Sequence, residues 1–272
     1  MSSTWQVLSS RLGDDAEGTG LFSKFSKFEA ALSASVTSPE SGTQLAALLD
    51  SANAVVTELN SLSKLVSQQR SEADREIADG VNVVNKALKQ IEELNGLLVG
   101  VDGSTSQAAA LMDERQRTLD TIAEYLPIEV VPREGGAIDI ITVEGVYLVA
   151  GKAKQLEFSP ANSFGADMTL DNGALSGLTI DGQNLTPGAS SYAAVSSGMF
   201  GALFTLRDTD LPAFGAQLDT IANDLVTRLS NDSIDPTKTP GDFGLFVDTG
   251  TPGDPGLAGR IDINALIDPS QG

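Results

Sequence analysis

Apolar residues spaced alternately three and four positions apart run through residues 45–98, and this pattern restricts the fold more than any other feature of the chain. Such spacing places one apolar stripe on a single helix, which other helices must cover. A polar interval at residues 68–76 interrupts the stripe before it resumes. We therefore predict one helix of roughly 80 Å, at about 1.5 Å per residue, with Gly80 as its expected bend or weak point. The stripe consists of Leu45, Leu48, Ala52, Val55, Leu59, Leu62, Val66, Ile77, Val81, Val84, Leu88, Ile91 and Leu98.

A short amphipathic helix is expected before the long one, at residues 21–35. Its phenylalanines share one face, and Lys24 and Lys27 are expected to point away from that face. The long helix is then predicted to start with Ser38 as its cap and Pro39 at its first position, because serine and proline favour these two positions.

The rest of the chain alternates between helical and strand-like patterns. Helical spacing predicts a helix at about residues 107–124, a short helical run at 197–206 and a last helix at 212–229. Between the first two lie β-branched runs at residues 128–131, 138–143, 146–149 and 156–159, separated by glycines. This is typical of a β-meander, and Asp181-Gly182 indicates a further hairpin. Residues 231–257 are rich in proline and glycine and are expected to be mostly loop.

These patterns predict an α+β fold, an elongated antiparallel helical bundle with a small inserted β domain. We expect residues 1–127 to form the first part of the bundle and residues 128–195 to form the inserted β domain of meander and hairpins. Residues 196–272 are expected to form the C-terminal part of the bundle, with a Pro/Gly-rich loop region.

The composition excludes several classes of function. The chain has no cysteine and no histidine, so zinc, iron–sulfur and haem sites, cysteine nucleophiles and histidine bases are not expected. A formal net charge of −20 opposes binding to nucleic acid or to an anionic membrane surface, and no apolar run approaches the length of a membrane span. We expect no cofactor, no metal and no catalytic site.

Four residues are candidates for structural roles in the bundle. Asn85 and Asn95 lie on the apolar stripe of the long helix, where a polar side chain can fix the register between neighbouring helices. Arg115 shares a stripe with Leu111, so it is expected to pair with carboxylates or asparagine carbonyls of the long helix. Asp113 precedes it in the same string of residues.

Two functional alternatives use the many carboxylates of the chain. Residues 231–242 resemble an oxygen-rich calcium loop, but Pro236 stands where such a loop needs glycine, and Asp242 is shorter than the usual bidentate glutamate. An extracellular acidic hydrolase with a carboxylate pair is the other alternative. Its candidate acids lie in the meander region and are Asp139, Glu144 and Glu157.

Several strings, in their order along the chain, resemble the family of flagellar hook-associated protein 1, the first of two proteins at the junction between hook and filament. The long-helix string keeps both asparagines, and the next string has the family's leucine–x–aspartate–x–arginine pattern. Gln116 and Asn231 depart from the family, which often has an acidic residue and a nearby histidine there. The matching strings are Leu21–Phe25, Val81–Asn95, Leu111–Arg115, Ile128–Val131, Gly173–Leu178, Gly198–Leu203, Leu218–Ala222 and Gly241–Phe246.

The resemblance implies a structural axial protein of the bacterial flagellum. It implies export through the flagellar secretion system to the outside of the cell, with hook protein, the second junction protein and an export chaperone as partners, and self-association in the assembled junction. The family's terminal polymerisation segments are not recognisable, so the chain is expected to be a core fragment that is monomeric by itself. Another flagellar axial protein, either the second junction protein or flagellin, remains the nearest alternative.

Overall fold

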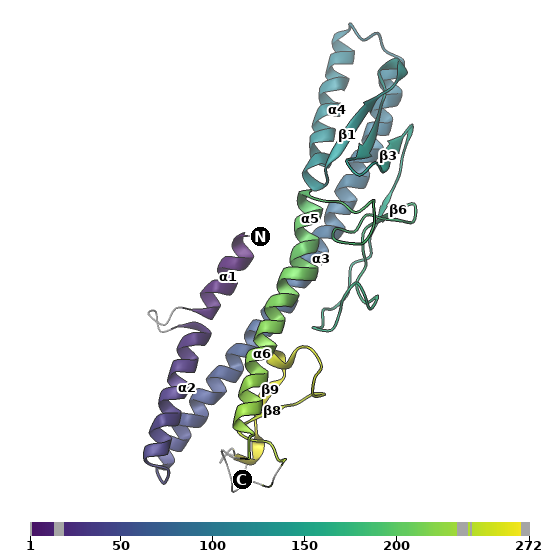
Figure 1. Ribbon diagram of the computed structural model, residues 1–272. Coiled ribbons are helices and arrows are strands. Elements are labelled where there is room, and N and C mark those ends of the chain that lie inside the picture. Colours follow the sequence, from purple (N-terminus) through teal and green to yellow (C-terminus); the bar gives the residue numbers. More distant parts are fainter. Residues whose placement is uncertain (1, 14–18, 233–238, 240, 268–272) are drawn as a thin grey trace. The chain divides into compact units, whose positions relative to one another are not determined.

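The structure, a computed structural model, describes residues 2–13, 19–232, 239 and 241–267. It confirms the α+β class, because long helices are combined with small antiparallel sheets (Figure 1). The helices are α1 (Ser2–Leu12), α2 (Gly20–Thr37), α3 (Gly42–Val99), α4 (Ser106–Tyr125), α5 (Gly198–Thr205) and α6 (Leu211–Leu229). Short 3-10 turns are η1 (Glu134–Gly136), η3 (Leu257–Gly259) and η4 (Ala265–Ile267), and a π-helical turn, η2 (Leu206–Asp210), joins α5 to α6.

The strands form three sheets within the described residues, with orders β1-β2-β3-β4, β5-β6-β7 and β8-β9. All neighbouring strands are antiparallel. The strands are β1 (Ile128–Pro132), β2 (Ile138–Thr142), β3 (Tyr147–Ala150), β4 (Lys152–Ala153), β5 (Leu156–Glu157), β6 (Thr179–Ile180), β7 (Gln183–Asn184), β8 (Phe246–Asp248) and β9 (Ile261–Ile263).

The chain divides into two compact units that do not coincide with the three predicted segments. Unit 1 consists of Met1–Gln69, Gly165–Asp167 and Leu211–Gly272. Unit 2 consists of Arg70–Phe164 and Met168–Asp210. Most of the segment at residues 128–195 thus belongs to unit 2, together with the C-terminal part of α3, α4 and α5, whereas Gly165–Asp167 belong to unit 1. The three-segment division of the sequence stays a prediction.

The apolar stripe of the long helix is confirmed as core. Its members are buried from Ala52 to Leu98, whereas Leu45 is 41% exposed. Gly80 lies inside the 58-residue helix α3, and the helix continues on both sides of it. A Cβ at Gly80 would lie 2.7 Å from the ring of Tyr125 and 2.9 Å from that of Phe200. The close approach of these two rings, rather than a bend, explains the glycine.

The predicted start of the long helix is wrong by one turn. Ser38 ends α2, with its N–H donating to the carbonyl of Ala34. Helix α3 begins at Gly42, and the Ser41 Oγ accepts a long hydrogen bond of 3.4 Å from the Gln44 N–H. Ser41 therefore takes the capping role predicted for Ser38, because it lies directly before the first helical turn.

The prediction that Lys24 points away from the apolar face of α2 is also wrong. The Lys24 ammonium contacts the Glu58 carboxylate, which lies on α3 and is only 6% exposed. Arg11 of α1 binds the other oxygen of that carboxylate at 2.9 Å. In unit 1 a buried acid on the long helix thus joins two short helices by charge, in a position that periodicity alone assigns to solvent.

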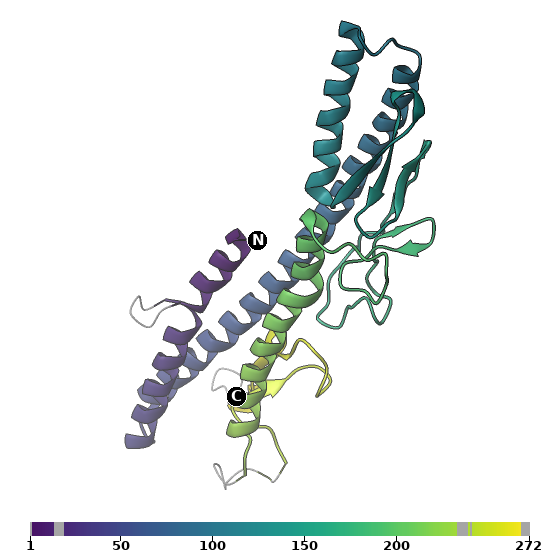
Figure 2. The same ribbon diagram turned by 45° about the horizontal axis from the view of Figure 1, so that its top comes forward.

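The predicted meander and hairpin are confirmed, with one change of partner. Strands β1 to β4 form a meander alongside the second half of α3 and α4, as Figures 1 and 2 both show. The expected strand at residues 156–159 instead opens the second sheet, pairing with β6. The β6–β7 hairpin turns at Asp181 and Gly182, whose φ angles of 48° and 75° are those of a left-handed two-residue turn.

Candidate functional site

Asn95 and Arg115 meet at the loop between β1 and β2. The Asn95 amide donates to the carbonyl of Ile138 at 2.7 Å, and its Oδ1 accepts from the Ile138 N–H at 3.1 Å. The Arg115 Nη1 donates to the carbonyl of Gly136 at 2.7 Å and lies 3.4 Å from Asn95 Oδ1. Partial burial lowers the pKa of Arg115, which nevertheless stays protonated. The two residues together fasten the start of β2 to α3 and α4.

Asn85 repeats the same two-point contact ten residues earlier on α3. Its Oδ1 accepts from the Leu156 N–H at 2.8 Å, and its Nδ2 donates to the Leu156 carbonyl at 2.9 Å. A primary amide carries one acceptor and one donor group, so it can satisfy both backbone groups of one strand residue. Asn85 and Asn95 therefore bind backbone groups of strands, not side chains of a neighbouring helix. That the two asparagines fix the register between helices stays a prediction.

Asp113 and Glu92 show how differently two carboxylates of unit 2 are used. Asp113 is exposed on α4 and makes no hydrogen bond or ion pair with any described residue. Glu92 of α3 accepts from the Ala153 N–H at 2.8 Å through one oxygen and binds Lys89 at 2.8 Å through the other. The bond from Lys89, followed by that from Ala153, lowers the pKa of Glu92. Glu92 is thus a further anchor of the sheet, and Asp113 is not one.

The most deeply buried of these anchors was not predicted and centres on Arg207, whose side chain is 0% exposed. Its Nη1 binds the buried carboxylate of Asp74 on α3 at 2.5 Å. Its Nε and Nη2 bind the two carboxylate oxygens of Asp208 at 2.8 and 2.9 Å, and Nη2 also donates to the Ser176 carbonyl at 3.0 Å. The second oxygen of Asp74 accepts from the Ala161 N–H at 2.7 Å. A single guanidinium therefore connects α3, η2 and the segment that precedes β6.

Aromatic rings complete the surroundings of this network. The Arg207 guanidinium carbon lies 4.7 Å from the centre of the Phe204 ring and 5.6 Å from that of Phe158. Arg70, which is 3% exposed, lies 5.4 Å from the Phe164 ring. It also donates to the Met168 carbonyl at 2.6 Å. Cations stacked on rings in a water-poor site are held more strongly than exposed ones.

Two sequence signals pointed to this network without identifying it. The polar interval at residues 68–76 of the apolar stripe contains Arg70 and Asp74, and a polar interruption of a core-facing stripe is normal where charges are buried in pairs. Arg207 lies three residues after Phe204 and four before Leu211, at an apolar position of a helical pattern. Nothing in the sequence shows that these two places, more than 130 residues apart, are in contact.

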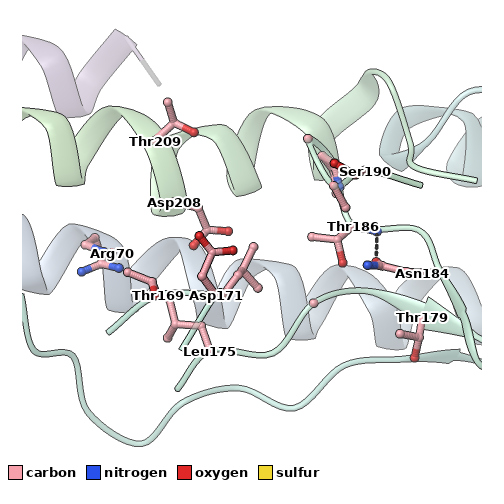
Figure 3. A pocket seen from close by; sticks show the side chains of 15 residues that line it. Arg70, Thr169, Asp171, Leu175, Thr179, Asn184, Thr186, Ser190, Asp208 and Thr209 are labelled. Atoms are coloured by element: carbon pink, nitrogen blue, oxygen red, sulfur yellow. Dashed lines mark hydrogen bonds between the residues drawn. The ribbon is translucent and has the colours of Figure 1, made fainter. Parts of the chain in front are cut away.

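A pocket of about 800 Å³ with a mixed polar and apolar lining adjoins the network in unit 2 (Figure 3). Asp171 and Asp208 both line it, but both oxygens of Asp208 accept hydrogen bonds from Arg207. Apart from these two acids, the side chains that line it are hydroxyls, one amide, Arg70 and the apolar side chains of two leucines, a proline and an alanine. The pocket therefore places one carboxylate, that of Asp171, in a position to act on a bound molecule.

The carboxylates proposed for a hydrolase do not line this pocket. Asp139 accepts from the Gly151 N–H at 3.0 Å, Glu144 accepts from the Ser196 N–H at 3.1 Å, and Glu157 lies 3.5 Å from the Thr179 hydroxyl. Each is engaged by a separate neighbour. These contacts give no support to a carboxylate pair of the kind that a hydrolase uses.

Unit 1 anchors its C-terminal segment with another set of polar side chains. Asn60 of α3 donates to the carbonyls of Ala258 and Ile261 at 3.1 and 3.2 Å. Asp219 of α6 accepts from the Ala258 N–H at 2.8 Å. Arg260 binds Asp248 at 2.7 Å and also donates to the carbonyls of Thr251, Asp254 and Pro255. The predicted loop region thus contains β8 and a well-bonded turn.

Metal and membrane functions gain no support from the described part of the chain. No group of three or more acidic, histidine or cysteine side chains there is placed to hold a metal ion. Most of the calcium-like loop, including Pro236, lies outside the described residues. Among the helices that the structure describes, none combines the length and the apolarity needed to cross a membrane.

The fold and its anchors define a structural helical protein in which a long helix carries small sheets by hydrogen bonds to their backbone. Comparison with known sequences identifies its family. The profile described as "Flagellar hook-associated protein FlgK helical domain" matches residues 8–233, and the chain belongs to this family.

Individual relatives agree with this assignment. The chain is 23% identical over 198 residues to flagellar hook-associated protein 1 of Escherichia coli, covering 71% of this chain and 34% of that protein. It is also similar in fold to the flagellar hook junction protein FlgK from Burkholderia pseudomallei, with a TM-score of 0.67 and 19% identity. That match covers 90% of this chain and 44% of the other, so the chain spans less than half the length of either relative.

Proposed function

We propose that the chain is the core of a structural axial protein of the bacterial flagellum and acts as an adaptor at the hook–filament junction. The family match over residues 8–233 carries this proposal. The dense anchoring of the sheets on α3 supports it, since a junction protein transmits load and gains from segments that cannot slide along their helix. We further propose that the protein is exported through the flagellar secretion system and works outside the cell, without enzymatic activity.

The proposed partners are hook protein on one side and the second junction protein on the other, with an export chaperone before secretion. Self-association is expected within the assembled junction. By itself the chain is expected to be monomeric, because a net charge of −20 opposes association at modest salt. Light scattering across a range of protein concentrations tests this, and a concentration-dependent dimer would contradict it.

Deleting the coding sequence in the bacterium of origin tests the proposed function. We expect hooks that lack filaments, with flagellin released into the medium, because the filament has no base on which to assemble. Reintroducing the gene should restore filaments and motility. Normal filaments on the deletion strain, seen by electron microscopy, would refute the role at the junction.

A further inference from the structure

A groove runs between α3 and α4 in unit 2. Two cavities of about 460 and 400 Å³ lie between these helices, and they share lining residues, so they form one continuous groove. Its lining on α3 extends from Val83 to Leu97, which is about 21 Å at about 1.5 Å per residue. These side chains lie roughly half a turn around α3 from Asn85, Glu92 and Asn95, which bind the strands. The groove therefore opens away from the sheet.

The groove has an apolar stripe that its own two helices cover only in part. On α3 the stripe consists of Val83, Ala87, Leu94 and Leu97, and Leu111 lines the groove from α4. Ala87 and Leu94 are buried, whereas Val83 and Leu97 at the two ends are 37% and 56% exposed. The four α3 positions keep the helical spacing of three, four or seven residues. A surface of this length and period fits a third helix, which can place apolar residues at i, i+3, i+4 and i+7 over it.

Two basic side chains face this groove without an acidic partner, although the chain has 37 acidic and only 17 basic residues. Lys86 and Arg117 line its 400 Å³ part, and neither makes an ion pair with a carboxylate in the described part of the chain. Glu114, the acid that lines the same part, already accepts a hydrogen bond from a glutamine of α3 at 2.8 Å. The 460 Å³ part adds Lys89 and Glu93, whose charges cancel. The groove thus offers two unpaired positive charges to carboxylates of a partner.

We propose that the groove between α3 and α4 binds an amphipathic helix of a neighbouring axial protein. The apolar stripe of that helix covers Val83 and Leu97, and its carboxylates pair with Lys86 and Arg117. The proposal rests on the proposed function, since it takes the partner from the assembled junction. A second copy of this chain fits less well, because two chains of net charge −20 repel each other at modest salt. Charge pairs beside such a groove select the partner and its orientation more than they add affinity.

Cysteine labelling in assembled flagella tests whether the groove is covered, because the chain has no cysteine of its own. Val83→Cys and Leu97→Cys should react readily with a maleimide in the purified chain. In isolated hook–filament complexes both should react at least about tenfold more slowly, because the core of an interface excludes the reagent. Equal reactivity in the two preparations would overturn the proposal.

Reversing the two charges tests what the partner carries. Lys86→Glu combined with Arg117→Glu should restore most of the reactivity of Val83→Cys in the complexes. Both side chains are exposed, so the midpoint of thermal unfolding should stay nearly unchanged in the purified chain. Lys152→Glu, at an exposed base on β4, is the control and should leave Val83→Cys protected. Protection that survives the double reversal would overturn the pairing with carboxylates. If the reversed protein does not assemble, Lys86→Gln with Arg117→Gln replaces it and is judged in the same way.

A photo-crosslinking amino acid in place of Leu97 identifies the occupant in the same complexes. We expect an adduct with another axial protein, at a helical segment that carries carboxylates beside an apolar stripe. An adduct only with a second copy of this chain, or no adduct at all, would overturn the proposal. These outcomes differ from a failure of the proposed function, since filaments would still be missing from the deletion strain. Normal filaments on that strain would instead refute the role at the junction.

Discussion

The two compact units fasten irregular segments to their helices with similar groups at very different degrees of burial. In unit 2 the ion pair between Arg207 and Asp74 has side-chain exposures of 0% and 1%. In unit 1 the comparable pair of Arg260 and Asp248 has exposures of 20% and 9%. Asparagine shows the same contrast, because Asn95 is buried against β2 whereas Asn60 of unit 1 is only half-buried.

The difference teaches what each set of anchors can contribute. A buried ion pair gains little net stability over an apolar pair, because both charges must lose their water. Once it is built, however, removing one partner leaves the other without compensation, so only one arrangement of the segment is acceptable. A partly exposed pair tolerates loss better, since water replaces the missing partner. We therefore expect unit 2 to be the more specifically fixed of the two units.

The largest expected effect separates the two ion pairs. Asp74→Ala should lower the free energy of unfolding by about 3–5 kcal/mol, because Arg207 and the Ala161 N–H then lose a buried acceptor. Asp248→Ala should cost about 1–2 kcal/mol, since Arg260 keeps its carbonyl partners and some contact with water. Urea titrations of both variants measure the difference. Equal losses would show that burial does not distinguish the two units.

The second largest difference is expected between the two asparagine anchors, Asn95 in unit 2 and Asn60 in unit 1. Asn95→Ala leaves both the N–H and the carbonyl of buried Ile138 without the side-chain partner, so we expect a loss of about 2–3 kcal/mol. Asn60→Ala removes bonds to two carbonyls in a half-buried place and should cost about 1 kcal/mol. Hydrogen exchange at the Ile138 amide adds a local check, because this proton should exchange much faster in the Asn95 variant. Unchanged protection would rule out the anchoring role.

Arg115 is expected to have a smaller effect than a buried ion pair would. Its partners are the Gly136 carbonyl and Asn95 rather than a buried carboxylate. Arg115→Ala should therefore lower the free energy of unfolding by about 1 kcal/mol. Arg117→Ala, an exposed neighbour on α4, is the control and should stay within about 0.5 kcal/mol. A loss as large as that of Asp74→Ala would mean that Arg115 has a role these contacts do not explain.

The features of the fold that depend on hydrophobic period and on local composition could be predicted from the sequence. The stripe of α3, the bounds of α4 and α6 to within about two residues, and the hairpin at Asp181 all follow from local rules. The start of α3 was misplaced because two serines compete for the cap. The direction of the Lys24 side chain was predicted wrongly because the periodicity of α2 does not show that the buried Glu58 of α3 lies opposite it.

The candidate site was predictable only in part, for the same reason. Asn85, Asn95 and Arg115 stand out because a polar residue on an apolar stripe needs a partner, but the stripe does not say which one. The partners are backbone groups of strands, and because every residue has such groups, the sequence does not show which residue provides them. Arg207 was missed because its acid, Asp74, is distant in sequence. Asp113, taken from a family pattern, makes no contact that a structural anchor would make.

The smallest expected effect is on acid stability and compares one carboxylate from each unit. Bonds from Lys89 and the Ala153 N–H lower the pKa of Glu92 in unit 2. In unit 1, burial tends to raise the pKa of Asp248, but bonds from Arg260 and the Gly250 N–H outweigh burial and lower it. A carboxyl whose pKa is lower in the folded state contributes stability above its unfolded pKa, and this contribution is lost as the pH falls through the folded value. Lowering the pH also relieves repulsion within a chain of net charge −20, so the wild-type profile alone is ambiguous.

Neutral variants remove that ambiguity because they share the background repulsion. Glu92→Gln and Asp248→Asn should both be less stable than the wild type at pH 7. Each difference should shrink between about pH 5 and pH 3, as the wild-type carboxyl becomes protonated and resembles the amide. The difference should be larger for Asp248, whose partner Arg260 is partly buried, than for Glu92, whose partner Lys89 is mostly exposed. Chemical unfolding at a series of pH values measures the stability difference between each variant and the wild type. A difference that stays constant with pH would show that the variant loses stability through altered packing and not through the lost charge.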